Sequence, residues 1–173
     1  MRLLKKKKII NEDYRIDLFT MFLSSAAFTG YIPFASGTFG SAFALIFLLI
    51  PGFLNPVVLG TLSLIFFFVG IITSERMMFR YGDDPSVVVL DEVVGMWITL
   101  LIAVIFLKEL NYISVVISFL SFRLFDIFKI WPAKYFDRLK SGFGIMFDDV
   151  VAGIYGGVFT VIIMKLINDY IKW

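Results

Sequence analysis

The sequence predicts an all-helical integral membrane protein, a multi-helix bundle, and three observations support this fold class. Of the 173 residues, 60% are hydrophobic and 17% are charged, whereas about 25% charge is usual in soluble domains. No charged residue occurs between Asp17 and Glu75. No ten-residue alternation of apolar and polar residues indicates a barrel, and lipid admits only helices or closed barrels. We expect one helical domain over residues 18–173, preceded by a charged, basic segment over residues 1–17.

Proline and glycine divide the apolar sequence into helices. We expect a helix over residues 18–31, a polar loop over 35–41, a short helix ending at Ile50, a turn through Pro56 and a longer helix over 57–73. Apolar stretches at 93–107, 110–122 and 150–164 predict three more helices, each 13 to 15 residues long. About 20 residues are needed to span the hydrocarbon core. Some of these helices are therefore expected to tilt, or to pack within a homo-oligomer, instead of spanning as single rods.

The remaining charge is concentrated in two windows, residues 75–92 and 123–149. Because each helical hairpin returns the chain to the side that it left, both windows and the 35–41 loop are expected to meet on one face of the membrane. Seven basic residues lie in these windows: Arg76, Arg80, Arg123, Lys129, Lys134, Arg138 and Lys140. The positive-inside rule makes this face cytoplasmic.

Two absent residue types narrow the chemistry. The chain has no Cys and no His. This excludes thiolate nucleophiles, zinc-thiolate and iron–sulfur sites, phosphohistidine intermediates and Ser-His-Asp triads. Acid–base and metal chemistry must then fall to carboxylates, Lys, Arg, Tyr, Ser and Thr.

Two acidic pairs stand at predicted helix starts. Asp91 and Glu92 open the 93–107 helix, and Asp148 and Asp149 open the 150–164 helix. Each pair alone could be a helix cap that complements the helix dipole. Two such pairs beside apolar helices, with a basic set nearby, favour a functional site. Because paired carboxylates without His or Cys suit a hard cation, we predict that Asp91, Glu92, Asp148 and Asp149 bind Mg²⁺, in preference to Ca²⁺ or Mn²⁺.

A basic set accompanies the acids. Arg123, Asp126 and Lys129 are spaced i, i+3, i+6, which places them along one side of a helix and directs them into one pocket. Arg123 and Lys129 suit a phosphate group, whose developing charge a metal would neutralise. Asp126 or Asp137 is the candidate to orient or deprotonate the attacking water.

Two glycine-containing segments complete the set of motifs. The 36–41 segment (SGTFGS) is either a simple turn or an anion site, in which the hydroxyls of Thr38 and Ser41 help to bind phosphate. Gly142-Phe143-Gly144 is expected to be a flexible turn that places Asp148 and Asp149. Asp83-Asp84-Pro85 reads as a turn.

Four motifs in order resemble the phosphatidylglycerophosphatase A family: SGTFGS at 36–41, VLDEVVG at 89–95, FRLFDIFK at 122–129 and GFGIMFDDVVAGIY at 142–155. One departure is Ile130, where the family has the first proline of Pro-Trp-Pro. The resemblance implies a multi-pass enzyme of the bacterial inner membrane, with its site facing the cytoplasm. Its implied reaction is the Mg²⁺-dependent hydrolysis of phosphatidylglycerophosphate to phosphatidylglycerol and phosphate.

Three other readings remain at this stage. A cation channel or transporter would need acidic residues in mid-helix, and 93–107 and 150–164 contain none. A CDP-alcohol phosphatidyltransferase would need an Asp-Gly-x-x-Ala-Arg pattern, which the sequence lacks. A non-catalytic membrane scaffold would tolerate Asn in place of Asp91 or Asp148. The expected partners are the membrane and a lipid substrate, and no nucleic acid.

Overall fold

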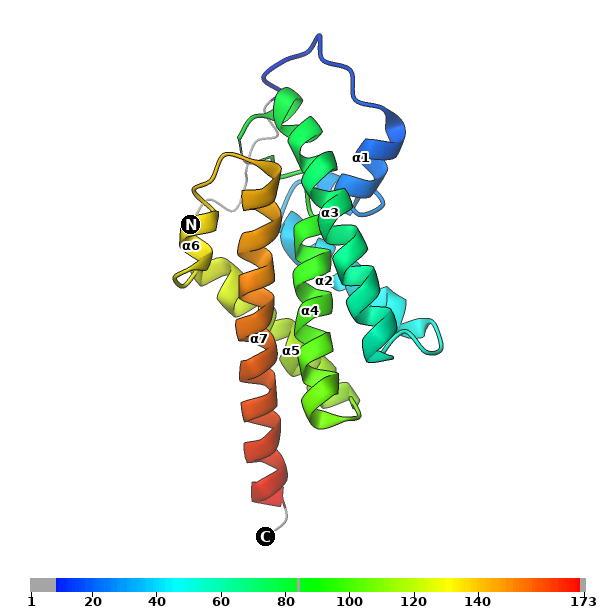
Figure 1. Ribbon diagram of the computed structural model, residues 1–173, viewed down its shortest axis with the longest axis vertical. Coiled ribbons are helices and arrows are strands. Elements are labelled where there is room, and N and C mark those ends of the chain that lie inside the picture. The colour runs from blue at the N-terminus through cyan, green and yellow to red at the C-terminus, as the bar shows by residue number, and fades with distance from the viewer. Residues whose placement is uncertain (1–8, 84, 172–173) are drawn as a thin grey trace.

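The computed structural model describes residues 9–83 and 85–171, and in this part of the chain the helices are joined by turns and loops, with no strand (Figure 1). Residues 1–8 of the predicted basic segment, and Asp84, lie outside the described residues. The predicted all-helical class is confirmed. In chain order the helices are α1 (Leu18–Ser24), α2 (Ser36–Ile46), α3 (Pro56–Tyr81), α4 (Leu90–Leu107), α5 (Tyr112–Phe128), α6 (Ala133–Phe136) and α7 (Gly142–Ile171), with 3-10 turns at Thr29–Tyr31 and Phe47–Leu49.

Within the described residues, three helices are long and apolar enough to cross a membrane: Pro56–Tyr81, Leu90–Leu107 and Gly142–Tyr170. The remaining helices are shorter, and α5 has 17 residues, equivalent to about 25 Å. This agrees with the expectation that some apolar helices do not span as single rods. In Figure 1, α4 begins at a lower level than the C-terminal end of α3 and the N-terminal end of α7.

Short polar side chains fix where the helices begin. Asn55 accepts hydrogen bonds from the backbone N–H groups of Val57 and Val58, and Pro56 occupies the first position of α3, where no backbone donor is needed. Asn111 caps α5 in the same way, through the N–H of Ser114 at 2.8 Å. These caps stand at the two turns that join the helices away from the acidic motifs.

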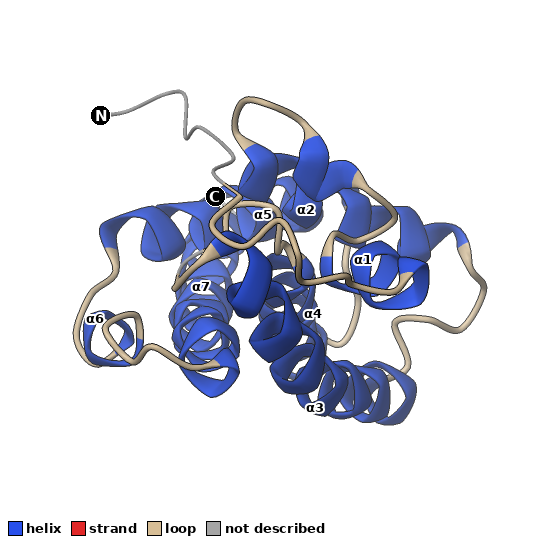
Figure 2. Ribbon diagram, turned by 90° about the horizontal axis from the view of Figure 1, so that it is seen from above, coloured by secondary structure: helices blue, strands red, loops and turns tan. Residues whose placement is uncertain are grey.

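The core surrounds α4, which lies between α7 on one side and α3 on the other (Figure 2). Trp97 of α4 is fully buried. Its indole packs edge-on against Phe47, Phe53 and Phe66, and its N–H donates to the carbonyl of Ala44 in α2 at 3.2 Å. An aromatic cluster with a satisfied polar group thus attaches α2 and α3 to α4.

Glycine allows α4 and α7 to approach closely. A Cβ on Gly153 would meet the carbonyl oxygen of Gly95 and would lie 3.2 Å from its Cα. Thr99 Oγ1 is 3.0 Å from the carbonyl oxygens of both glycines. This backbone contact sets the spacing of the two helices that carry both predicted acidic pairs.

Replacing Gly153 with Ala should therefore force α4 and α7 apart and cost about 1–3 kcal/mol of stability. Gly60 of α3 is the matched control, because the nearest atom to a Cβ there is Leu101 Cδ2 at 3.6 Å, an ordinary contact. Gly60→Ala should leave stability unchanged or raise it by up to about 1 kcal/mol. Thermal unfolding of the detergent-solubilised protein, followed by circular dichroism, measures both. Equal unfolding temperatures for the two variants would contradict this role of Gly153.

The first predicted helix, 18–31, is wrong in its length. The chain turns after Ser24, and Ala26, Ala27 and Phe28 all have positive φ. The Ser25 hydroxyl stabilises this turn by donating to the Met21 carbonyl at 2.6 Å and accepting from the Phe28 N–H at 3.0 Å. The seven residues of α1 extend about 10 Å and pack on α3. A helix of that length does not cross a membrane.

Three other predicted boundaries are also wrong. The polar loop 35–41 is instead the start of α2, and the turn at 142–144 is the first turn of α7. There the Gly142 N–H donates to Glu75 Oε2 at 2.6 Å, and the Gly144 N–H donates to Ser141 Oγ at 3.1 Å. The 57–73 helix continues to Tyr81, where Glu75 and Arg76 are exposed and half-buried Arg80 donates to the Tyr14 carbonyl at 2.9 Å.

Candidate active site

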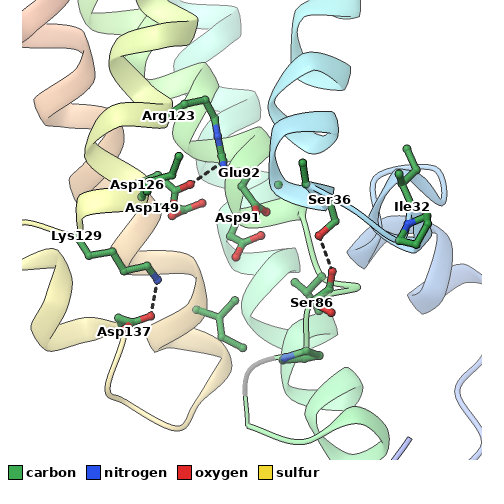
Figure 3. A pocket seen from close by; sticks show the side chains of 17 residues that line it. Ile32, Ser36, Ser86, Asp91, Glu92, Arg123, Asp126, Lys129, Asp137 and Asp149 are labelled. Carbon is green, nitrogen blue, oxygen red and sulfur yellow. Dashed lines mark hydrogen bonds and ion pairs between the residues drawn. The ribbon is translucent and has the colours of Figure 1, made fainter. Parts of the chain in front are cut away.

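The motifs meet in one pocket with a volume of about 560 Å³, between the starts of α2, α4 and α7 and the end of α5 (Figure 3). Its polar wall combines acidic and basic side chains: Asp91, Glu92 and Asp149, then Arg123, Asp126, Lys129 and Asp137. The opposite wall is formed by the 32–37 segment and the 85–88 loop. The predicted gathering of the polar motifs at one end of the bundle is confirmed, although helix ends supply most of the residues.

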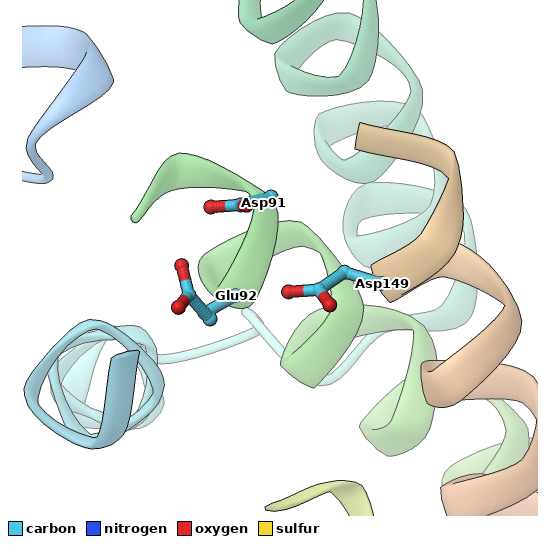
Figure 4. A group of neighbouring side chains, drawn as sticks. All are labelled: Asp91, Glu92 and Asp149. Atoms are coloured by element: carbon cyan, nitrogen blue, oxygen red, sulfur yellow. The ribbon is translucent and has the colours of Figure 1, made fainter. Parts of the chain in front are cut away.

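Three carboxylates lie together in this pocket. One oxygen each from Asp91, Glu92 and Asp149 lies within 4.8 Å of the others (Figure 4). Asp91 and Glu92 are in the first turn of α4, and Asp149 is in the second turn of α7. Asp91 Oδ1, Glu92 Oε2 and Asp149 Oδ2 are buried and have no hydrogen-bond partner within the described residues. Buried carboxylates without partners repel one another, so this acidic trio favours a bound cation.

Arg123 faces the acidic trio from α5. Its Nη1 pairs with Asp126 Oδ2 at 2.6 Å, and both side chains are largely buried. The same nitrogen donates to Ser41 Oγ at 3.3 Å, while the Ser41 hydroxyl donates to the Gly37 carbonyl at 2.8 Å. The guanidinium is thus fixed from two sides, with its positive charge directed at the pocket.

Lys129 follows the last residue of α5 and pairs with two carboxylates. Its ammonium contacts Asp137, after α6, and Asp148 Oδ2 of α7 at 2.5 Å. Burial alone would lower the pKa of Lys129, but the charges of Asp148 and Asp137 outweigh burial and raise it above the ordinary value for lysine. Lys129 therefore remains positively charged at the pocket wall.

Asp148 does not join the acidic trio, although it was predicted as a fourth metal ligand. It is buried, and its carboxylate is directed to Lys129. Consecutive residues of a helix point about 100° apart, so Asp148 and Asp149 face different neighbours. The structure places Asp149 at the trio and Asp148 behind Lys129.

The comparison with protein families adds to this geometry. The model of the phosphatidylglycerophosphatase A family matches residues 22–164, a range that contains every residue lining the pocket. This chain belongs to the phosphatidylglycerophosphatase A family. It is accordingly a phosphatase, with helices apolar enough to span a membrane.

Three relatives match the chain, and two of them are named phosphatidylglycerophosphatase A. The phosphatidylglycerophosphatase A of Escherichia coli K12 is 34% identical over 128 residues, which cover 73% of this chain and 72% of the relative. That of Haemophilus influenzae is 34% identical over 130 residues, covering 73% and 77%. A Bacteroides thetaiotaomicron protein, whose name proposes a phosphatidylinositol-3-phosphatase, is 38% identical over 132 residues, covering 73% and 82%. No solved structure matches the chain.

Within the phosphatidylglycerophosphatase A motif at 36–41, the residues at the pocket differ from those predicted. Thr38 and Ser41 do not line the pocket. Ser41 Oγ instead accepts a hydrogen bond from Arg123 Nη1. Ser36, which the sequence analysis did not select, does line it and donates to the Ser86 carbonyl at 2.9 Å. If the helix had been predicted to begin at Ser36, its spacing would have placed Gly37, Ser41 and Ala44 on one buried face. Ser41 would then have been assigned to the core.

Proposed function

We propose that this phosphatase hydrolyses the terminal phosphate monoester of phosphatidylglycerophosphate at the bacterial inner membrane, with Mg²⁺ as cofactor. The observation that carries the proposal is the pocket in which three carboxylates face Arg123 and Lys129. Metal-assisted phosphoryl transfer requires carboxylates that bind a metal beside basic side chains that bind the phosphate anion.

Arg123 and Lys129 are the proposed phosphate ligands. Asp126 and Ser41 hold the Arg123 guanidinium, so few rotamers must be lost when it binds an anion. Lys129 already contacts two carboxylates, and a phosphate entering the pocket would compete with the exposed one, Asp137. Ser36 offers a further hydroxyl at the opposite wall.

Asp91, Glu92 and Asp149 are the proposed magnesium ligands. They fit this ion because all three offer hard oxygen donors, and each has a buried oxygen without a partner in the described structure. Bound there, Mg²⁺ would neutralise charge that develops on the phosphoryl oxygens.

Asp126 is the proposed residue that orients the attacking water. Figure 3 shows it beside Asp149 and next to Arg123, so its carboxylate stands where the phosphate ligand and the acidic trio meet. Asp137, the other candidate, lies at the exposed rim and contacts Lys129. We therefore propose that Asp126 orients the attacking water and that Asp137 positions Lys129 through their ion pair.

The pocket is proposed to face the cytoplasm. Arg76 and Arg80 near the end of α3, and Lys134, Arg138 and Lys140 around α6, stand at the same end of the bundle as the site. Lys108 is the one basic residue in the turn at the other end of α4. Basic residues concentrated at one end indicate the cytoplasmic side.

The proposal predicts that the purified protein in detergent releases inorganic phosphate from phosphatidylglycerophosphate with Mg²⁺. EDTA should lower the rate at least about 100-fold, because a metal contributes several kcal/mol to transition-state stabilisation. Phosphatidic acid and phosphatidylinositol-3-phosphate serve as comparison substrates, the second because a relative is named for it. Faster release from either of these would change the assigned substrate. Release that is unchanged in EDTA would remove Mg²⁺ from the proposal.

A further inference from the structure

Ile127 belongs both to the pocket and to the outer surface of the protein. It lines the pocket between Asp126 and Lys129, yet its side chain is 64% exposed. An apolar side chain between two charged ones on a pocket wall is not needed to bind phosphate. Its position indicates that an apolar part of a ligand contacts this side of the pocket.

Exposed apolar residues continue from Ile127 along α5. Val116, Leu120 and Leu124 precede it at intervals of four, four and three residues, and each is exposed. This spacing places all four side chains on one face of the helix. The pocket wall is thus the end of an apolar stripe that runs the length of α5.

The facing wall has the same character. Ile32 and Pro33 line the pocket, and the next residue, Phe34, is 54% exposed. Phe34 packs edge-on against Phe39 of α2, with ring centroids 5.6 Å apart. Exposed apolar residues thus flank the pocket both on α5 and on the segment that precedes α2.

The depth of the pocket agrees with access from the side. The acidic trio includes the first turn of α4, where a candidate membrane span begins. Asp149 is seven residues past the start of α7, equivalent to about 10 Å along the helix. In Figure 1 the first turn of α4, which carries Asp91 and Glu92, lies below the C-terminal end of α3 and the start of α7. A lipid that left the bilayer and approached the acidic trio from the aqueous side would expose its acyl chains to water, which is unfavourable.

We propose that the opening between the 32–34 segment and Ile127 is a lateral port, through which a diacyl phospholipid monoester enters from the bilayer. Its acyl chains pass between Ile127 and the 32–34 segment and stay in the bilayer, while its phosphate reaches Arg123 and Lys129. A phospholipid is assigned as the occupant because Arg123 and Lys129, which are positively charged, lie where the apolar surface meets the pocket. The identity of the headgroup rests on the proposed function, whereas the route of entry rests on the apolar walls.

The test compares Ile127→Asn with Leu120→Asn. Both residues are branched aliphatic side chains on the same face of α5, at 64% and 60% exposure, but Leu120 does not line the pocket. Each variant is assayed with long-chain phosphatidylglycerophosphate in vesicles and with the same headgroup lacking acyl chains. Ile127→Asn should lower the ratio of kcat/KM for the lipid to that for the free headgroup about tenfold, the scale of a lost apolar contact. Leu120→Asn should not change this ratio. A ratio that is unchanged in Ile127→Asn, or lowered equally in both variants, overturns the port.

A second measurement does not depend on turnover. Because the natural chain has no Cys, Ile127→Cys and Leu120→Cys each introduce a single thiol. In EDTA, vesicles of phosphatidylcholine that contain phosphatidylglycerophosphate should slow maleimide labelling of Cys at 127, relative to phosphatidylcholine alone, and should not slow labelling at 120. Equal labelling rates at 127 in both vesicles contradict the port. If the wild-type protein hydrolyses none of the lipids while protection at 127 is observed, the proposed function fails and the port stands.

Discussion

Replacing Asp149 with Asn should abolish most Mg²⁺-dependent phosphatase activity, whereas the same change at Asp148 should leave the metal requirement intact. Asp149 contributes an oxygen to the acidic trio, while the neighbouring Asp148 is directed to Lys129. Loss of a metal ligand should cost about 3–4 kcal/mol of transition-state stabilisation, or roughly 10²–10³-fold in rate at fixed Mg²⁺. Asp148→Asn should instead raise KM, because Lys129 loses its buried partner.

The decisive measurements are the Mg²⁺ concentration that gives half-maximal activity and the rise in unfolding temperature on adding Mg²⁺. Binding to the folded state alone stabilises a protein by about 2.7 kcal/mol at 100 times Kd. Wild type and Asp148→Asn should show this rise, and Asp149→Asn should lose it. Both variants retain a side chain of the same size, so a difference between them reports on the carboxylate. Equal shifts in the two variants would return Asp148 to the ligand set, as the sequence first suggested.

Replacing Arg123 with Met should both destabilise the protein and reduce its activity at least about 100-fold. Arg123 is the ion-pair partner of Asp126, and the two side chains are 14% and 12% exposed. Removing one partner of a buried pair leaves the other charge uncompensated, at a cost of about 3–5 kcal/mol. Here that charge would also face the acidic trio. Denaturant unfolding and phosphate release measure the two effects separately.

A double variant separates the effect on folding from the effect on activity. In Arg123→Met/Asp126→Asn the uncompensated carboxylate is gone, so stability should return toward the wild-type value. Activity should not return, since the proposed phosphate ligand and the proposed water-orienting carboxylate are both missing. Arg123→Lys should keep the fold but bind phosphate more weakly, because an ammonium cannot donate as a bidentate fork. Recovery of activity in the double variant would rule out Arg123 as a phosphate ligand.

The sequence predicted the helical class, the meeting of the motifs and the charged residues that line the pocket, because these follow from composition and order alone. Asp91 and Glu92 begin a helix as expected. The separation of Asp148 from the acidic trio was not predicted, for a physical reason. With α7 taken to start at residue 150 instead of Gly142, the side of the helix that each aspartate faces could not be determined.

Other differences had no signal in the sequence. Three consecutive residues without a glycine, Ala26 to Phe28, adopt positive φ, a conformation that propensity argues against. Gly37 and Gly40 suggested a flexible loop, yet both lie within α2. A Cβ on Gly40 would be 2.8 Å from Val89 Cβ, so that glycine serves close packing. Sequence alone does not distinguish these two uses of glycine.

The division of the acidic trio between α4 and α7 has a consequence for biosynthesis. Glu92 and Asp149 are 57 positions apart, and α7 is the last helix of the described chain. A nascent chain that has inserted only the helices before α7 carries two of the three carboxylates and lacks the Gly153 surface that packs on Gly95. The proposed cation site is therefore complete only when α7 docks. A chain truncated before α7 would enter the membrane without the means to act on its lipids.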